Sequence, residues 1–186
     1  MMKNRLSRGA SKADWLEAAL SILDCGNVSN ITIEGLARTL GISKSGFYWH
    51  FKNRDDLLRA ILDYWVHEIT EVITENTELV TLDPKARLRV TAEMILKHDF
   101  VRYEIGIRQW AMQNPGVAKA VKKVNRIRLV FVSQALEELG FRGDDLEMRA
   151  MLFVCYHTWE SEMFREVSEK RRRDMIQGRV DLITQL

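Results

Sequence analysis

Residues 32–51 read TIEGLARTLGISKSGFYWHF, and their pattern predicts two short helices joined by a tight turn. Thr32 precedes apolar residues that recur at intervals of three and four, so its hydroxyl can cap the first helix. Gly41 stands where a helix commonly ends in a left-handed conformation, which glycine adopts without strain. Ser43 can cap a second helix that begins at Lys44. The stretch therefore has the layout of a helix-turn-helix.

The second helix of this stretch is expected to combine buried and exposed aromatic residues. Phe47 and Phe51 are four positions apart and can pack inside, which leaves Tyr48 and Trp49 on other faces. Next to Lys44, such a face can donate hydrogen bonds, contact thymine methyl groups and neutralise phosphate. On spacing alone, a helical hairpin with incidental surface aromatic residues remains the alternative.

Charge is unevenly distributed along the 186 residues, whose formal net charge is +2. Residues 1–54 hold eight Lys or Arg against four Asp or Glu, which favours an encounter between this segment and a polyanion. The hydrophobic content of 46% is that of an ordinary globular protein. No apolar run approaches the roughly 20 residues that span a bilayer, and the N-terminus lacks the apolar core of a signal peptide. We therefore expect no membrane partner.

Cysteine and histidine positions indicate neither a disulfide framework nor a metal centre. Cys25 and Cys155 lie far apart in apolar helical contexts, which favours reduced, structural thiols and a cytoplasmic protein. His67, His98 and His157 show no paired ligand spacing, so we expect no metal and no cofactor. A glycine-rich phosphate loop, a nucleophile motif and a pair of carboxylates flanking a histidine are also lacking from the sequence. We therefore expect that the protein is not an enzyme.

The first helix carries an apolar stripe that we expect to face the helix pair, because the connection between them is short. Ser11 can cap this helix and Gly26 can end it. The residues of the stripe are Ala13, Leu16, Ala19, Leu20 and Leu23.

Further helices are predicted along the rest of the chain, and no strand pattern or internal repeat interrupts them. Asn53 can cap a long helix of about five turns, and Pro84 and Pro115 each stand where a helix begins. The expected helices cover about residues 11–24, 53–73, 84–98, 99–113, 117–139 and 143–164, followed by an amphipathic C-terminal segment. The fold class is therefore all-α.

The helix expected over 143–164 is unusual because residues 150–156 are apolar in succession. A helix that is apolar around most of its circumference is buried on more than one side. Such a helix can be the central helix of a monomer of this size, or it can present one face to its own core and another to a partner subunit. We therefore expect a homodimer interface within about 143–186, around Met151 to Tyr156.

Several features occur together between about residues 11 and 58. They are Ala18-Ala19, the helix start Thr32-Ile33, Leu36-Ala37, the turn Leu40-Gly41-Ile42-Ser43, the run Phe47-Tyr48-Trp49-His50-Phe51, and Lys52-Asn53-Arg54 followed by Leu57-Leu58. In this combination the segment resembles the N-terminal domain of TetR-family transcriptional regulators. One departure is Ser45-Gly46, where many family members have glycine first and a small residue second.

The resemblance implies an N-terminal three-helix headpiece with the helix-turn-helix over residues 1–54, followed by a long linking helix. Residues 55–186 would form a helical ligand-binding and dimerisation domain. The partner would be double-stranded DNA, with residues 44–51 of each subunit in successive major grooves of a palindromic operator. Thr32 and Ser43 would contact phosphate or cap helices. The remaining expected DNA contacts are Lys44, Ser45 and Tyr48 at bases or the adjoining backbone, and Trp49, His50 and Lys52 at phosphates.

A small-molecule effector is also implied by the resemblance, since family members commonly leave their operator when a ligand binds the C-terminal bundle and changes the separation of the headpieces. The expected function is a repressor of this kind. The alternative is a helical protein-interaction module without sequence-specific DNA binding. Bulky side chains of the bundle are candidates for lining the effector cavity, and they are Trp65, Met94, Tyr103, Trp110, Phe131, Tyr156 and Trp159.

Overall fold

The computed structural model describes residues 9–25, 27–98 and 101–185. Over these residues the chain forms helices and no strands, which confirms the predicted fold class. It divides into two compact units, of which the first comprises residues 1–65 and 103–121 and the second residues 66–102 and 122–186. The chain therefore passes between the two units three times.

The first unit contains the predicted helix-turn-helix and one later helix. Its elements are α1 (Lys12–Cys25), η2 (Val28–Asn30), α2 (Ile33–Leu40), η3 (Lys44–Trp49), α3 (Arg54–Val66, whose last residue falls in the second unit), α7 (Glu104–Ala111) and the first turns of α8 (Pro115–Glu138).

Local side-chain caps set the starts of the helices in this unit, as the sequence predicted. The amide of Asp14 donates to Ser11 Oγ over 3.2 Å, and the amide of Gly35 donates to Thr32 Oγ1 over 3.1 Å. Asn53 Oδ1 accepts the amide of Asp56 at 2.9 Å at the start of α3. Each bond satisfies an amide that the first helical turn leaves without a partner. Gly41 ends α2 with φ of 69°, the left-handed value expected at this position.

Trp15 lies at the centre of the first unit's core, where the predicted stripe of α1 is partly wrong. Trp15 is fully buried, and its ring meets that of Phe47 edge-on with centroids 5.3 Å apart. Ala13 of the predicted stripe is exposed and Leu16 is only half-buried. The buried face follows Trp15, Ala19 and Leu23 instead, because residues four apart share a helix face.

Helix α7 belongs to the first unit although it follows residue 54 by a long stretch of chain. It contacts α1 and η2, and Ile107 and Trp110 of α7 are buried. The compact units therefore do not follow the predicted boundary at residue 54. The functional division into 1–54 and 55–186 stays a prediction, because compactness does not assign function.

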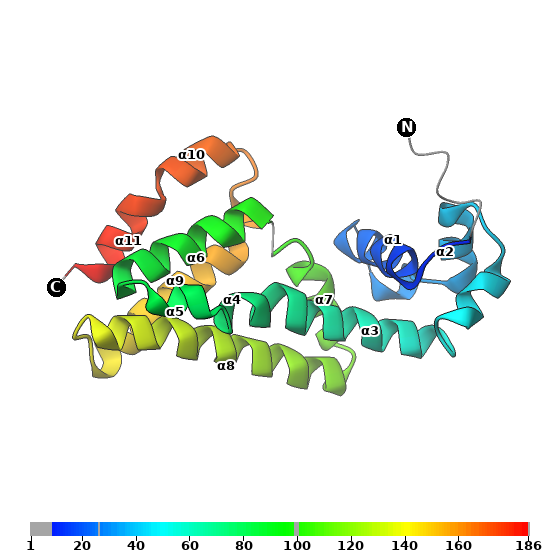
Figure 1. The fold of residues 1–186 in the computed structure, drawn as a ribbon, viewed down its shortest axis with the longest axis horizontal. Coiled ribbons are helices and arrows are strands. Elements are labelled where there is room, and N and C mark those ends of the chain that lie inside the picture. The colour runs from blue at the N-terminus through cyan, green and yellow to red at the C-terminus, as the bar shows by residue number, and fades with distance from the viewer. Residues whose placement is uncertain (1–8, 26, 99–100, 186) are drawn as a thin grey trace. The chain divides into compact units, whose positions relative to one another are not determined.

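The second unit is a bundle in which α6 and α11 lie side by side (Figure 1). Its buried core includes Leu88, Leu136, Phe153, Ile176 and Val180. Its elements are the π-helical turn η4 (His67–Glu71), α4 (Val72–Thr74), α5 (Thr77–Thr81), α6 (Pro84–His98), the remainder of α8, α9 (Gly143–Met163), α10 (Glu169–Asp174) and α11 (Ile176–Thr184).

Several predicted helix boundaries are confirmed and others are corrected. Helical structure continues from Arg54 to Thr74 through α3, η4 and α4, as expected of the long helix. Helices α6 and α8 begin at Pro84 and Pro115. The helix expected over 99–113 begins only at Glu104, and residues 99–100 lie outside the described residues, as do Gly26 and Leu186. The C-terminal segment is divided into two helices at Met175, and α5 was not predicted.

A buried arginine that the sequence did not reveal joins α6 to α8 within the second unit. Arg87 is 5% exposed, and its Nη1 and Nη2 donate to the two carboxylate oxygens of Glu138 at 2.8 and 3.1 Å. The same guanidinium donates to carbonyl oxygens of α5 and the residue that follows it. Hydrogen bonds from Arg87 hold the pKa of Glu138 below its ordinary value. The pair is therefore satisfied as a buried guanidinium requires.

Helix α9 divides its apolar residues between two faces. Phe153 is buried in the second unit's core, whereas Met148, Met151 and Leu152 are large exposed hydrophobic residues. Cys155 is a free thiol on the exposed side, so it is not the packed structural thiol that its apolar context predicted. The expectation that α9 has a second apolar face is thus borne out, and the side chains of Met148, Met151 and Leu152 are exposed within the part of the chain that the structure describes.

Candidate nucleic-acid interface

The side chains of η3 separate sharply into an inner and an outer set. Phe47 is fully buried and Phe51, just beyond η3, is 2% exposed, whereas Tyr48 is 58% exposed and Trp49 is 86% exposed. Lys44 and Ser45 are exposed on the same short segment. The predicted separation of buried Phe47 and Phe51 from the exposed side chains is confirmed. The rings of Tyr48 and Trp49 are exposed beside the Ser45 hydroxyl and the Lys44 ammonium group. Such a surface has the chemistry that groove and phosphate contacts use.

The segment that carries these side chains is a 3₁₀ helix rather than the predicted α-helix. The amide of Gly46 donates to the carbonyl of Ser43 at 3.3 Å, and that of His50 donates to the carbonyl of Phe47 at 2.9 Å. These are bonds between residues three apart, which define 3₁₀ geometry. Ser43 occupies the predicted cap position, but its hydroxyl lies 2.5 Å from Ser45 Oγ and makes no capping bond. The capping role predicted for the Ser43 side chain is therefore wrong.

Lys44 lies beside an acidic residue of α2. Its Nζ is 3.5 Å from Glu34 Oε1, and both side chains are exposed. A hydrogen bond from the Glu34 backbone amide, assisted by the one from Lys44, lowers the pKa of the Glu34 carboxyl. Glu34 therefore carries a negative charge directly beside the cation expected to meet DNA.

The flanking candidates lie at the two edges of η3. His50 is half-buried, and its Nε2 is 2.9 Å from the carbonyl oxygen of Ala10, which must accept. This bond ties the ring to the segment that precedes α1. Thr32 is exposed at the start of α2, and Lys52 is exposed just before α3, where its backbone amide donates to Asp56 Oδ2 at 3.0 Å. The structure thus gathers the eight predicted DNA contacts around η3 and the adjoining helix starts, while their roles at DNA stay predictions.

Arg54 is a positioning residue for this site, a role that the sequence did not predict although Arg54 belongs to the run Lys52-Asn53-Arg54. Its Nε donates to the carbonyl of Ile31 at 2.6 Å, and its Nη2 donates to the carbonyl of Val28 at 2.7 Å. These bonds tie the start of α3 to η2 and to the residue before the Thr32 cap. The available signal was a basic residue at a helix start, where the helix dipole disfavours it.

At Ser45-Gly46, where the order of the two residues differs from that of many TetR-family members, the structure shows which residue is buried. Ser45 is exposed, whereas Gly46 is half-buried. A β-carbon on Gly46 would lie 3.9 Å from the Trp15 ring, which is ordinary contact. Space alone therefore does not demand glycine at position 46.

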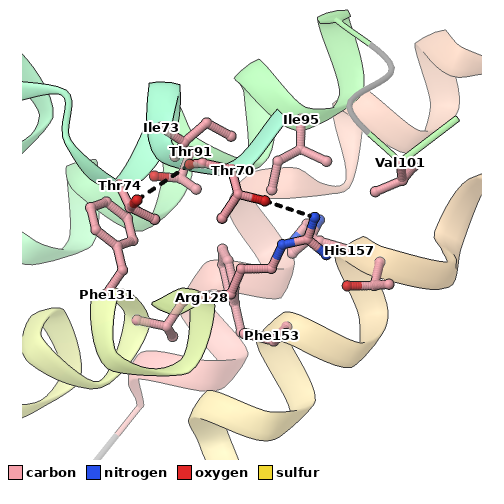
Figure 2. A pocket seen from close by; sticks show the side chains of 13 residues that line it. Thr70, Ile73, Thr74, Thr91, Ile95, Val101, Arg128, Phe131, Phe153 and His157 are labelled. Atoms are coloured by element: carbon pink, nitrogen blue, oxygen red, sulfur yellow. Dashed lines mark hydrogen bonds between the residues drawn. The ribbon is translucent and has the colours of Figure 1, made fainter. Parts of the chain in front are cut away.

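The residues expected to line an effector cavity are distributed over both compact units. A cavity of the second unit (Figure 2) includes Phe131 of that set in its wall. Trp65, Tyr103 and Trp110 belong to the first unit instead, and the two tryptophans are buried in it. Met94 packs half-buried on the second unit's core, and Trp159 is half-buried on α9. Tyr156 donates from its hydroxyl to Glu160 Oε1 at 3.0 Å. Side-chain size alone did not reveal which helix faces enclose the cavity.

Among residues 9–25, 27–98 and 101–185, no group of three or more His, Cys, Asp or Glu is arranged to hold a metal ion. Within the same residues, none of the helices combines the length and apolar character needed to traverse a lipid bilayer.

These features define a helix-turn-helix protein with an exposed aromatic and basic face. Residues 16–61 match the family described as "Bacterial regulatory proteins, tetR family". The chain is 27% identical over 143 residues to the tetracycline repressor protein class A from Escherichia coli, which covers 77% of this chain and 61% of that protein. It is 29% identical over 92 residues to the transcriptional regulator TtgR of Pseudomonas putida, covering 46% and 43% of the two chains. The chain thus spans about half the length of these curated relatives.

The fold agrees with a solved structure across nearly the whole chain. A transcriptional regulator from Rhodococcus sp. Rha1 superposes with a TM-score of 0.72 at 15% identity, covering 95% of this chain and 97% of that one. By the family match, the N-terminal part of the chain, residues 16–61, belongs to the TetR family of bacterial regulatory proteins. This membership favours a DNA-binding regulator over the protein-interaction module considered from the sequence.

Proposed function

We propose that the protein is a homodimeric repressor that binds a palindromic operator in double-stranded DNA and leaves it when a small-molecule effector binds. The single observation that carries the DNA-binding part is the outer face of η3. Tyr48 and Trp49 are exposed there beside Lys44 and Ser45, while Phe47 fixes the segment from within. In this proposal Lys44, Ser45 and Tyr48 reach bases or adjoining backbone, and Trp49 contacts phosphate.

The proposed dimer uses the outer face of α9. Met148, Met151 and Leu152 form an exposed apolar strip on this helix, and the neighbouring part of α8 adds Val130, which is 49% exposed. A strip of this kind on two copies can form a self-complementary two-fold interface. Two headpieces related in this way would read the two halves of a palindromic site.

The effector part of the proposal rests on the cavity of the second unit. Its volume is about 50 Å³, smaller than the roughly 300–1,000 Å³ typical of small-molecule sites, so an effector would have to widen it. A ligand releases DNA only if it binds the DNA-free arrangement more tightly than the DNA-bound one. The proposal includes a cytoplasmic location, where operator and effector meet.

The decisive experiment is selection of genomic fragments by the purified full chain, followed by footprinting of the selected site. We expect protection of a palindrome, with affinity that falls steeply as salt rises because counterions are released from phosphates. Tyr48→Ala and Trp49→Ala should abolish specific binding without loss of folding. Met112→Ala is the matched control, because Met112 is as exposed as Trp49 at 86%.

A different result would assign another function to the helix pair. Selection that returns no preferred sequence would favour the protein-interaction module. Wild-type footprints from both aromatic variants would show that η3 is not the reading segment.

A further inference from the structure

An open groove of the second unit lies between α8 and α9. On α8 its lining residues recur at intervals of three and four from Lys122 to Glu137, so they share one face of that helix. On α9 the lining residues lie between Gly143 and Met151. Most of the lining residues are exposed, whereas a small-molecule site encloses most of its ligand. The shape of the groove therefore suits a protein surface better than a small molecule.

The middle of the groove is apolar. It is lined there by Leu129 and Val130 of α8 and by Leu146, Ala150 and Met151 of α9. Val130 is 49% exposed and Met151 is 46% exposed. Because Met151 also belongs to the exposed apolar strip of α9 in the proposed dimer, the strip and the groove form one continuous surface.

Charges of opposite sign lie at the two ends of this groove. The basic end consists of Lys122 and Arg126, which lie in the first half of α8. Glu137 lies about 16 Å further along the helix axis than Arg126. Asp144 and Glu147 lie close to Glu137, because only residues 139–142 separate α8 from α9. Glu137, Asp144 and Glu147 therefore form an acidic end, and all five side chains are exposed.

The charges of both ends lack a partner in the part of the chain that the structure describes. None of the five takes part there in an ion pair or a side-chain hydrogen bond. Neighbouring charges that do not line the groove are paired, since Lys123 lies 3.5 Å from Glu71 and Arg149 lies 2.8 Å from Asp145. The two ends of the groove are therefore available to the charges of another chain.

A second copy of the chain presents the same groove with the same two ends. In a two-fold interface, each surface patch meets the identical patch of the other subunit. If the two α8 helices run antiparallel, the basic end of each copy lies against the acidic end of the other. A parallel arrangement places like charges together, which is unfavourable. The charge pattern is therefore self-complementary in the antiparallel orientation.

We propose that the groove binds the same groove of a second copy, with the two α8 helices antiparallel and the basic end of each copy against the acidic end of the other. The inference deepens the dimer part of the proposed function and rests on it for its biological meaning. The apolar middle supplies contact area, while the charged ends select the orientation and the partner. A chain with one sign of charge at both ends is rejected.

Charge reversal at one end tests this pairing. Lys122→Glu with Arg126→Glu makes both ends acidic, and Glu137→Lys with Glu147→Lys makes both ends positive. Asp144 is left unchanged because it lies in the first turn of α9, where a negative charge stabilises the helix. Sedimentation of the full chain without DNA measures the dimer dissociation constant. We expect each double variant to dimerise at least about tenfold more weakly than the wild type at low salt, and the difference to shrink at about 1 M salt.

Mixing the two double variants restores the opposite charges. In the mixed dimer, each acidic end meets a positive one, so an equimolar mixture should form heterodimers with nearly the affinity of the wild-type dimer. A fluorescent label on one variant identifies the heterodimer in sedimentation. All four substitutions in one chain exchange the two ends and should restore the homodimer. This fourfold variant keeps the test decisive if one double variant does not fold.

Lys170→Glu with Arg171→Glu is the matched control, because it changes the net charge equally on α10 at exposed residues outside the groove. It should dimerise like the wild type, and a deficit equal to that of the groove variants would overturn the inference. Wild-type affinity in both groove variants would overturn it too, as would failure of both the mixture and the fourfold variant to dimerise. Monomers of Leu152→Glu beside wild-type dimers of the groove variants would keep α9 in the interface and reject the charged ends alone.

Discussion

Gly106 of α7 lies against the backbone of Leu23 in α1, so closely that a β-carbon on Gly106 would be 2.4 Å from the Leu23 carbonyl oxygen. The same atom would also meet the Leu23 side chain at 2.7 Å. Backbone at this distance cannot move aside as the end of a flexible side chain can. The absence of a side chain at position 106 is therefore what lets α7 pack on the helix that supports the DNA-binding segment.

Gly106→Ala should destabilise the protein by about 1–3 kcal/mol, the usual cost of overpacking. An alanine inside a helix is ordinarily more stable than glycine by about 0.5–1 kcal/mol, so the sign of the effect is diagnostic. Urea unfolding measures it. Gly178→Ala in α11 is the control, because nothing lies within 4 Å of its added β-carbon. Equal stabilisation by both substitutions would contradict the close approach.

The pair formed by Lys44 and Glu34 predicts opposite effects on DNA binding. Glu34→Gln removes a negative charge beside the proposed phosphate contact and should strengthen operator binding several-fold at low salt. Lys44→Gln should weaken binding and reduce the salt slope by about one. Fluorescence anisotropy across a salt series measures both.

Glu169→Gln is the matched control for this pair, because Glu169 forms an exposed ion pair with Arg173 in the second unit. This change should leave operator affinity as it is. An unaltered salt slope in Lys44→Gln would remove Lys44 from the phosphate contacts.

Leu152→Glu should yield monomers in analytical ultracentrifugation. Leu152 is 56% exposed in the single chain, and a charge placed in the proposed apolar interface would be desolvated without a partner. Met112→Glu introduces the same charge at an exposed residue of the first unit and should remain dimeric. Dimers of Leu152→Glu would move the interface away from α9.

Acid should destabilise the second unit through His157. The side chain is 4% exposed, and burial lowers its pKa although Glu160 on the same helix acts in the opposite direction. Below the ordinary histidine pKa of about 6.5, the unfolded chain takes up a proton that the folded chain resists. The free energy of unfolding that His157 contributes above that pH is therefore lost as the pH falls toward the lowered pKa of His157 in the folded protein.

Urea unfolding at about pH 7.5 and about pH 5.5 measures this loss, and His157→Gln should reduce the difference between the two. The interval between these two pH values lies above the pH range in which Glu138 and Glu71 lose their charge, because the pKa values of both carboxyls are lowered by their hydrogen-bond partners. An identical pH dependence in the wild type and the variant would assign the acid sensitivity to other groups.

Much of the DNA-binding segment could be predicted because its signals act over short distances. The Thr32 cap and the left-handed Gly41 each depend on neighbours within about one helical turn. The burial of Phe47 and the exposure of Tyr48 follow from their different directions on one short helix. The 3₁₀ geometry of η3 was missed because the sequence pattern does not distinguish it from an α-helix over so few residues.

The cavity of the second unit could not be predicted in the same way. Phe131 was found, but Trp65 and Trp110 belong to the core of the first unit. Apolar side chains favour both cores and cavities, so their chemistry does not tell the two apart. The polar residues that distinguish this cavity, Thr91 and Arg128, are brought to it by helices α6 and α8.

The sequence by itself determined the helical class, the helix starts at Thr32, Asn53, Pro84 and Pro115, and the inner and outer sets of side chains between residues 32 and 51. These depend on backbone geometry and capping within a few residues. Only the tertiary structure decided that Gly106 lies on Leu23 and that Arg54 binds the carbonyls of Val28 and Ile31. Those contacts join residues far apart in the chain, and packing of whole helices selects them.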